Sequence, residues 1–334
     1  MFGRVYPPVC LAILLAFIFP LTLTAQISID DVHVAARSHG ITLATPGTIA
    51  RIPNGIQLIH SNVDLVTVPV TITDALNRPV VGLDQDNFQV FENKKPQEIR
   101  NFSTDDAPVS IGIILDVSGS MANKLARARE AVQQFCDASN PQDEFFMITF
   151  SDAPNLTADF TGSAEELQNR LLTVRAHGRT ALLDAIHLGL RKMGQARYAR
   201  RALLIISDGG DNRSRFSERD VKAAAKEADV LIYAVGIFDN YFNTEEETLG
   251  PELLASVTRL TGGQTFTLRN IGELPALTRI IGNQLRHQYL LAYRPQFMPK
   301  DGKWHKISVK LRLPKTWNGF LRVNARPGYY AQDQ

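Results

Sequence analysis

Two aspartates and three hydroxyl residues stand where their side chains could act together. They are Asp116, Ser118, Ser120, Thr180 and Asp208. The first three alternate directly after the apolar run 111–115, Thr180 opens a predicted helix, and Asp208 directly follows the apolar run 202–206. Carboxylates and hydroxyls are hard oxygen ligands that suit Mg²⁺ or Mn²⁺, and less obviously Ca²⁺, which prefers more carboxylates. The pattern therefore predicts a divalent metal site.

Other site chemistry has less support in the sequence. The histidines include no pair at helical ligand spacing and no cysteine lies in these segments, which argues against zinc or copper. A hydrolase needs a base near the attacking group, and these segments offer only Asp152 or Asp211. Fingerprints of nucleophile elbows and phosphate loops are missing. We therefore expect no enzymatic activity, and metal-assisted hydrolysis is the weaker alternative.

The elements that must position these residues alternate between strand and helix. Continuous apolar runs predict buried parallel strands at 111–115, 145–150, 202–206 and 230–235. Amphipathic spacing predicts helices at 125–135, 165–174, 181–193, 217–228 and 251–260, two of them starting near Ser163 and Ser217. Together these predict an α/β fold with a doubly wound, mainly parallel sheet over residues 106–283. Such a sheet binds ligands at the carboxyl ends of its strands, where Asp116 would lie.

Strand patterns return on both sides of this domain. Alternating or β-branched segments occur at 63–73, 88–92, 97–102, 288–293, 306–311 and 319–323, with a turn at 93–96. The C-terminal set has too few strands to bury a core alone. We therefore expect residues 62–105 and 284–334 to pack as one smaller, β-sandwich-like domain, preceded by an irregular segment, 26–61.

The first 25 residues are typical of a secretory signal peptide. Arg4 precedes the apolar run 9–19, and small residues lead to a predicted cleavage after Ala25. The run is shorter than the roughly 20 residues of a membrane span, so an uncleaved anchor is the poorer interpretation. We expect an exported, periplasmic or extracellular protein without strong membrane association after cleavage.

Cysteine content and charge exclude further possibilities. Only Cys136 remains in the mature chain, so no intramolecular disulfide can form, and its place in an apolar helix stripe predicts a buried, inert thiol. The net charge of +2 offers no footprint for nucleic acid or an anionic membrane surface.

The combination of motifs is more specific than any one of them. Asp-x-Ser-x-Ser after a buried strand, a helix-initiating threonine and an aspartate after another buried strand together resemble the metal-ion-dependent adhesion site of von Willebrand factor type A domains, whose sheet is Rossmann-like. The resemblance covers about half of the chain. The β segments that contain residues 63–68 and 88–93 further resemble secreted bacterial proteins of this family.

The resemblance implies roles for the candidate residues. Ser118 and Ser120 would ligate the metal directly, and Thr180, Asp116 and Asp208 directly or through water. The sixth position would accept an aspartate or glutamate carboxylate of a protein partner, so that adhesion makes and breaks no covalent bond. The alternative is a mainly structural scaffold module whose metal only stabilises it.

One residue departs from the family pattern. Members often carry glycine before the threonine, whereas this chain has Arg179. Arg179, Arg213 and Arg215 could form a cationic rim around the metal that steers acidic ligands towards it. The alternative is that all three are solvated loop arginines without such a role.

Overall fold

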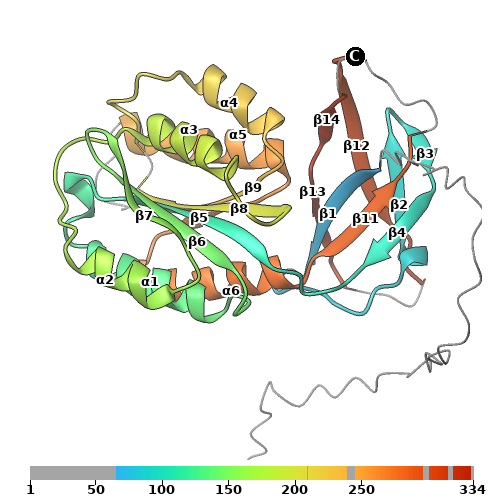
Figure 1. Ribbon diagram of the computed structural model, residues 1–334, viewed down its shortest axis with the longest axis horizontal. Helices are drawn as coiled ribbons and strands as arrows, with labels where there is room; N and C mark the ends of the chain where they lie inside the picture. The colour runs from blue at the N-terminus through green and yellow to red at the C-terminus, as the bar shows by residue number, and fades with distance from the viewer. Residues whose placement is uncertain (1–64, 209, 239–244, 296–300, 315–318, 332–334) are drawn as a thin grey trace, which may run out of the picture. The chain divides into compact units, whose positions relative to one another are not determined.

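The computed structural model describes residues 65–208, 210–238, 245–295, 301–314 and 319–331. All of them belong to one compact unit, His60–Gln334. The predicted signal peptide (1–25) and the irregular segment 26–61 lie outside the described residues. The described part consists of an α/β domain and a smaller β domain (Figure 1).

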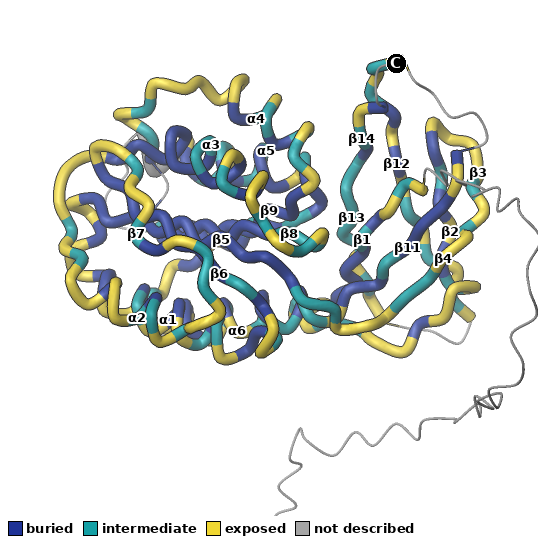
Figure 2. Tube along the Cα trace, in the orientation of Figure 1, coloured by how far each residue is buried: buried dark blue, intermediate teal, exposed yellow. Residues whose placement is uncertain are grey.

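A six-stranded sheet forms the centre of the α/β domain. Its strands, in spatial order, are β10 (Thr265–Leu268), β9 (Leu231–Ile237), β8 (Arg200–Ser207), β5 (Val109–Asp116), β6 (Glu144–Phe150) and β7 (Pro154–Thr161). All neighbours pair in parallel except β7, which runs antiparallel to β6 at one edge. The central strands are buried almost throughout (Figure 2), as their continuous apolar runs require.

Three helices cover each face of this sheet (Figure 1). One face carries α1 (Leu125–Asp137), α2 (Ala164–Leu172) and α6 (Leu274–Arg286), and the other carries α3 (Leu182–Met193), α4 (Glu218–Glu227) and α5 (Glu245–Thr261). Ser163 accepts a hydrogen bond from the N–H of Glu166, and Ser217 forms a capping box with Asp220. The predicted starts of these two helices and the doubly wound fold are confirmed.

Two antiparallel four-stranded sheets make up the β domain. One has the order β13 (Arg322–Ala325), β1 (Val66–Thr73), β11 (Tyr289–Tyr293) and β4 (Ile99–Ser103). The other has the order β14 (Gly328–Tyr330), β12 (Trp304–Leu311), β2 (Phe88–Glu92) and β3 (Lys95–Gln97). Their apolar faces share one core. Each sheet combines N-terminal and C-terminal strands, as the predicted fold class requires.

The region after β2 differs in detail from the sequence prediction. Asn93 and Lys94 both have positive φ, 47° and 70°, so they form a two-residue turn and residues 95–97 already pair with β2. The next strand, β4, pairs instead with β11 in the other sheet. The predicted strand at 97–102 is therefore two strands, because the chain changes sheets within it.

Short 3-10 helices complete the secondary structure. They are Gln85–Asn87, Gly119–Met121 and Ile271–Glu273. Among the described residues, no helix is long and apolar enough to cross a membrane.

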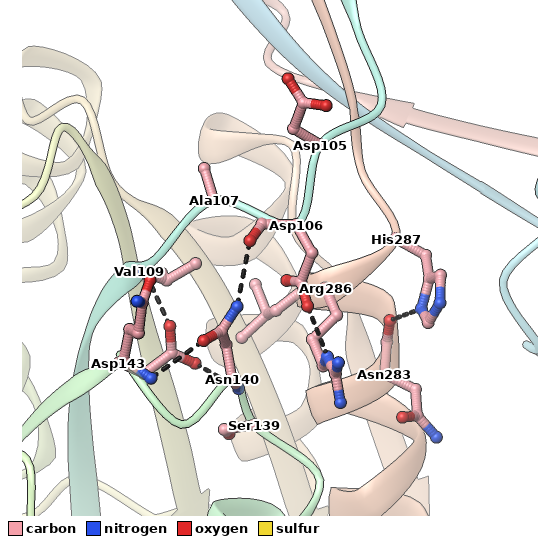
Figure 3. A network of polar contacts seen from close by, with 12 residues as sticks. Asp105, Asp106, Ala107, Val109, Ser139, Asn140, Asp143, Asn283, Arg286 and His287 are labelled. Carbon is pink, nitrogen blue, oxygen red and sulfur yellow. Dashed lines mark hydrogen bonds and ion pairs between the residues drawn. The ribbon is translucent and has the colours of Figure 1, made fainter. Parts of the chain in front are cut away.

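The chain passes between the two domains twice, and polar contacts hold both crossings. At the first crossing, the carbonyl of Asp106 accepts a hydrogen bond from Asn140 Nδ2 at 3.0 Å, and its carboxylate lies 2.9 Å from Arg286 Nε (Figure 3). The guanidinium of Arg200 donates to the carbonyl of Ala107 in the first crossing and to that of Leu285 just before the second, both at 2.7 Å. These bonds fix the path of each linker against the α/β domain.

Candidate metal centre

The candidate site lies where the strand order of the parallel sheet reverses. The chain runs from β5 to β6 on one side and later returns to β8 on the other, so β5 and β8 are neighbours. Their parallel register pairs Leu115 with Ile206, which places Asp116 and Asp208 at adjacent carboxyl ends. Helix α1 follows β5 on one face and α4 follows β8 on the other, the arrangement in which doubly wound sheets bind ligands at this edge.

Backbone hydrogen bonds bring the threonine loop to the same edge. The N–H of Gly119 donates to the carbonyl of Gly178 at 3.1 Å, and the N–H of His177 donates to the carbonyl of Val117 at 2.9 Å. Thr180 is further tied to the loop after Asp208, because Asn212 Oδ1 accepts from its N–H at 3.0 Å. The three predicted segments therefore meet.

The side chains at this edge form a compact polar group. Ser118 and Ser120 share a hydrogen bond of 3.0 Å between their Oγ atoms. Asp116 is fully buried, and its two oxygens accept from the N–H of Ser118 at 2.8 Å and from Ser207 Oγ at 2.6 Å. Ser118, Thr180 and Asp208 are also buried, whereas Ser120 is exposed. The site is thus a polar floor that is open on the side of Ser120.

Two carboxylates oppose each other in this buried setting. Burial raises the pKa of Asp116 to about 6, the negative charge of Asp208 adds to the rise, and the hydrogen bonds from Ser118 and Ser207 offset part of it. A cation beside both carboxylates would offset this repulsion. The donor set of two carboxylates and three hydroxyls therefore fits a hard divalent ion. Among the described residues, no group of three or more histidine, cysteine, aspartate or glutamate side chains could hold a metal.

Lys124 is a site residue that the sequence did not single out. Its Nζ lies 3.3 Å from Asp208 Oδ2, and both side chains are about nine-tenths buried. Lys124 caps the start of α1, four residues after Ser120. The sequence signal was a lysine at the buried end of an amphipathic helix, and only the fold shows that it faces Asp208.

A serine and a histidine also pair beside the site. His177 Nδ1 lies 3.0 Å from the carbonyl of Arg175, which can only accept, so His177 Nε2 is free to accept from Ser151 Oγ at 3.2 Å. The pair borders a hollow of about 480 Å³ next to Val117. The N–H of Ser151 points to the carbonyl of Ala153, so this serine does not supply the oxyanion donor that acyl transfer uses.

The two aspartates that the sequence offered as bases have other partners. Asp152 Oδ1 accepts from the N–H of Arg179 at 3.1 Å. Asp211 accepts from the N–H of Leu183 at 2.7 Å and from Ser214 Oγ, and so caps α3. Both carboxylates hold the loops of the site in place.

The three arginines of the predicted rim are exposed at the surface of these loops. Arg215 Nε lies 3.5 Å from Asp184 Oδ2, which offsets part of its charge.

Comparisons with known proteins concern the same residues. Residues 111–210, which include all five predicted ligands, match the family model of the von Willebrand factor type A domain. A UPF0353 protein of Mycolicibacterium paratuberculosis is 24% identical over 240 residues, covering 65% of this chain and 71% of that protein.

Two solved structures are also similar. A von Willebrand factor type A protein from Catenulispora acidiphila is 13% identical with a TM-score of 0.47, covering 81% of this chain and 74% of that one. An aerotolerance-related membrane protein from Bacteroides fragilis is 19% identical with a TM-score of 0.42, covering 53% of this chain and 98% of that one.

Proposed function

We propose, from the match of residues 111–210 to the von Willebrand factor type A domain, that the chain is a metal-dependent protein-binding module. Such domains typically mediate protein–protein interactions. The ligand of this one would be an aspartate or glutamate carboxylate on a partner, bound through a divalent cation.

One observation carries the proposal: two buried carboxylates face each other without enough positive charge to balance them. Asp116 and Asp208 end adjacent strands, and repulsion between them contributes to the raised pKa of Asp116. Burying two anions together is costly unless a cation neutralises them. Hard oxygen donors beside them favour Mg²⁺ or Mn²⁺ over softer metals.

The residues of the site have different proposed roles. Asp116, Asp208, Ser118, Ser120 and Thr180 would hold the ion. When bound, the ion supplies an electrophilic position that attracts a further carboxylate. Ser120 is exposed while the other four residues are buried, so the open side of the site, by which a partner would approach, is the side of Ser120.

Arg179 and Arg213 would steer acidic partners towards this side. Both are exposed on loops that meet at Thr180, whereas Arg215 is partly offset by Asp184. Exposed charges of one sign increase association rates most at low ionic strength. Replacing all three arginines with glutamine should lower the on-rate at low salt, and an unchanged salt dependence would count against steering.

The test of metal binding is calorimetric titration of the mature chain with Mg²⁺ and Mn²⁺, beside Asp116→Ala and Ser118→Ala variants. We expect binding by the native chain that both variants lose. No binding at millimolar metal would overturn the metal-dependent part of the proposal.

The test of partner binding uses a short peptide that contains aspartate and a matched peptide with asparagine. Metal-dependent binding of the aspartate peptide alone supports the adhesion-type function. If metal stabilises the fold but neither peptide binds, the alternative of a structural scaffold with a stabilising metal is favoured.

The proposed place of action is outside the cytoplasm, periplasmic or extracellular. Support comes from the predicted signal peptide, residues 1–25. Mass spectrometry of the exported protein should find Gln26 at its N-terminus. An intact Met1 on the exported form would contradict cleavage.

A further inference from the structure

Lys124 places a fixed positive charge inside the candidate metal centre. Its side chain is 8% exposed and that of Asp208 is 10% exposed, and its Nζ lies 3.3 Å from Asp208 Oδ2. The backbone holds Lys124 firmly, because its N–H donates to the carbonyl of Met121 and its carbonyl accepts from the N–H of Ala128. The ammonium therefore enters the site from the residue that directly precedes α1, held by two backbone hydrogen bonds.

Burial makes this ion pair different from an ordinary surface pair. Lys192 and Asp159 also pair in this domain, at 2.6 Å, but the Asp159 side chain is 67% exposed while that of Asp208 is 10% exposed. Water screens an exposed pair and makes it worth little. Between buried groups, charges act over a longer range and must be balanced locally.

The charge balance of the site is incomplete with lysine alone. Asp116 and Asp208 can carry two negative charges, against the single positive charge of Lys124. A divalent ion near these carboxylates would be attracted to both and repelled by the ammonium. Lysine and metal therefore compete for the same negative potential.

We infer that Lys124 is a tethered competing cation, which partly neutralises the site without metal and lowers its affinity for divalent ions. This inference rests on the proposed function and adds its regulation. Lys124 would let the domain fold in low metal, and would restrict occupancy to compartments where the divalent ion is abundant. The residue would thus set the metal concentration at which partner binding begins.

The test compares Mn²⁺ affinity and metal-free stability among variants of the mature chain. Lys124→Met keeps the apolar stem and removes the charge, and Lys124→Arg keeps the charge. Lys192→Met is the matched control, because it removes a lysine–aspartate pair at the far end of α3. Calorimetry measures the affinity, and circular dichroism follows thermal unfolding in chelator and in Mn²⁺.

We expect Lys124→Met to bind Mn²⁺ roughly tenfold more tightly than the native chain, since a buried like charge has been removed. Its melting temperature should fall in chelator and rise more on metal addition. Lys124→Arg and Lys192→Met should keep the native affinity within about threefold, because the charge of the site is unchanged. If Lys124→Met folds only when Mn²⁺ is present, the inference is equally supported.

Other outcomes overturn the inference and separate it from the proposed function. If the native chain binds Mn²⁺ and Lys124→Met binds it equally or more weakly, competition by Lys124 is rejected, while the proposed metal site is still supported. If neither protein binds Mn²⁺, both ideas fail. If only Lys124→Met binds, lysine excludes the metal, which supports competition and rejects a metal-dependent native function.

Discussion

Asp116 combines full burial with a negative neighbour, and this makes metal-free stability depend on pH. Its pKa is about 6 in the folded chain, raised first by burial and then by Asp208, against about 3.9 for an unperturbed aspartate. The folded state therefore holds a proton that the unfolded state has already released. The contribution of Asp116 to the free energy of unfolding is therefore fully present below about pH 4 and is lost as pH rises through about 6.

The expected loss is on the order of 3 kcal/mol of unfolding free energy between these limits. Urea unfolding in chelator, at several pH values, measures it. Asp116→Asn, which cannot ionise, should lack this component, so the difference between the two proteins isolates it from other titrating groups. Identical pH profiles of the two proteins would show that ionisation of Asp116 does not change the free energy of unfolding.

Cys136 should be inert in the folded mature chain. It lies on α1 and packs against the core, half-buried and not fully buried as its stripe position predicts. Burial, with Asp137 and Asp143 nearby, raises its pKa to about 12. At about pH 8.5 the thiolate population then falls roughly a thousandfold relative to a free thiol. Alkylation followed by mass spectrometry should therefore label the protein only after unfolding. Rapid labelling of the native chain would contradict burial of this thiol.

The residues of the centre could be predicted from the sequence only where a motif marks them. Asp116, Ser118 and Ser120 share a short local pattern, and Asp208 follows a clear strand. Lys124 and the Ser151–His177 pair carry no such pattern. Lys124 is 84 residues from Asp208 along the chain, and Ser151 is 26 residues from His177. Contacts of that range are set by the packing of elements, which periodicity does not reveal.

At the scale of elements, α5 is followed directly by a glycine, Gly262, that two constraints require. Gly262 has φ +85°, a left-handed conformation that glycine adopts without penalty. A Cβ there would also lie 2.4 Å from Ala325 C and Arg326 N in the β domain. Gly262→Ala should therefore cost several kcal/mol, more than the roughly 1–2 kcal/mol of a left-handed alanine alone.

Gly82 offers a matched control for this prediction. It has the same φ of +85°, but nothing lies within 4 Å of the position its Cβ would take. Gly82→Ala should show only the conformational cost. Urea unfolding of both variants would separate strain from collision, and equal losses would mean that the β domain can move away from α5.

Element prediction succeeded where burial was complete and failed at edges. Strands β5, β6, β8 and β9 are buried on both faces, so each appears in the sequence as an unbroken apolar run. Strand β7 escaped prediction because it is an edge strand that begins with Pro154 and is largely exposed. Its residues gain stability from pairing with β6, and an edge strand's first residue is a position where proline costs little.

At the scale of the whole described unit, Arg200 connects the two domains. It is the first residue of β8, and its guanidinium donates to carbonyls in the first crossing and to Leu285 and Gln288 at the second. Burial lowers its pKa, while Asp106 and Asp143 oppose this. One half-buried cation thus satisfies acceptors at both linkers, which should make the α/β and β domains unfold together.

Arg200→Met tests this coupling. The variant removes three part-buried hydrogen bonds to Ala107, Leu285 and Gln288, so we expect a loss on the order of 3 kcal/mol and a thermal transition that broadens or divides into two. Arg201→Met is the matched control, since Arg201 Nε donates to Tyr198 within the α/β domain and its loss should keep a single transition. Differential scanning calorimetry distinguishes the cases, because a divided transition gives a van't Hoff enthalpy below the calorimetric one. A single sharp transition in Arg200→Met would show that Arg200 is not needed to couple the two domains.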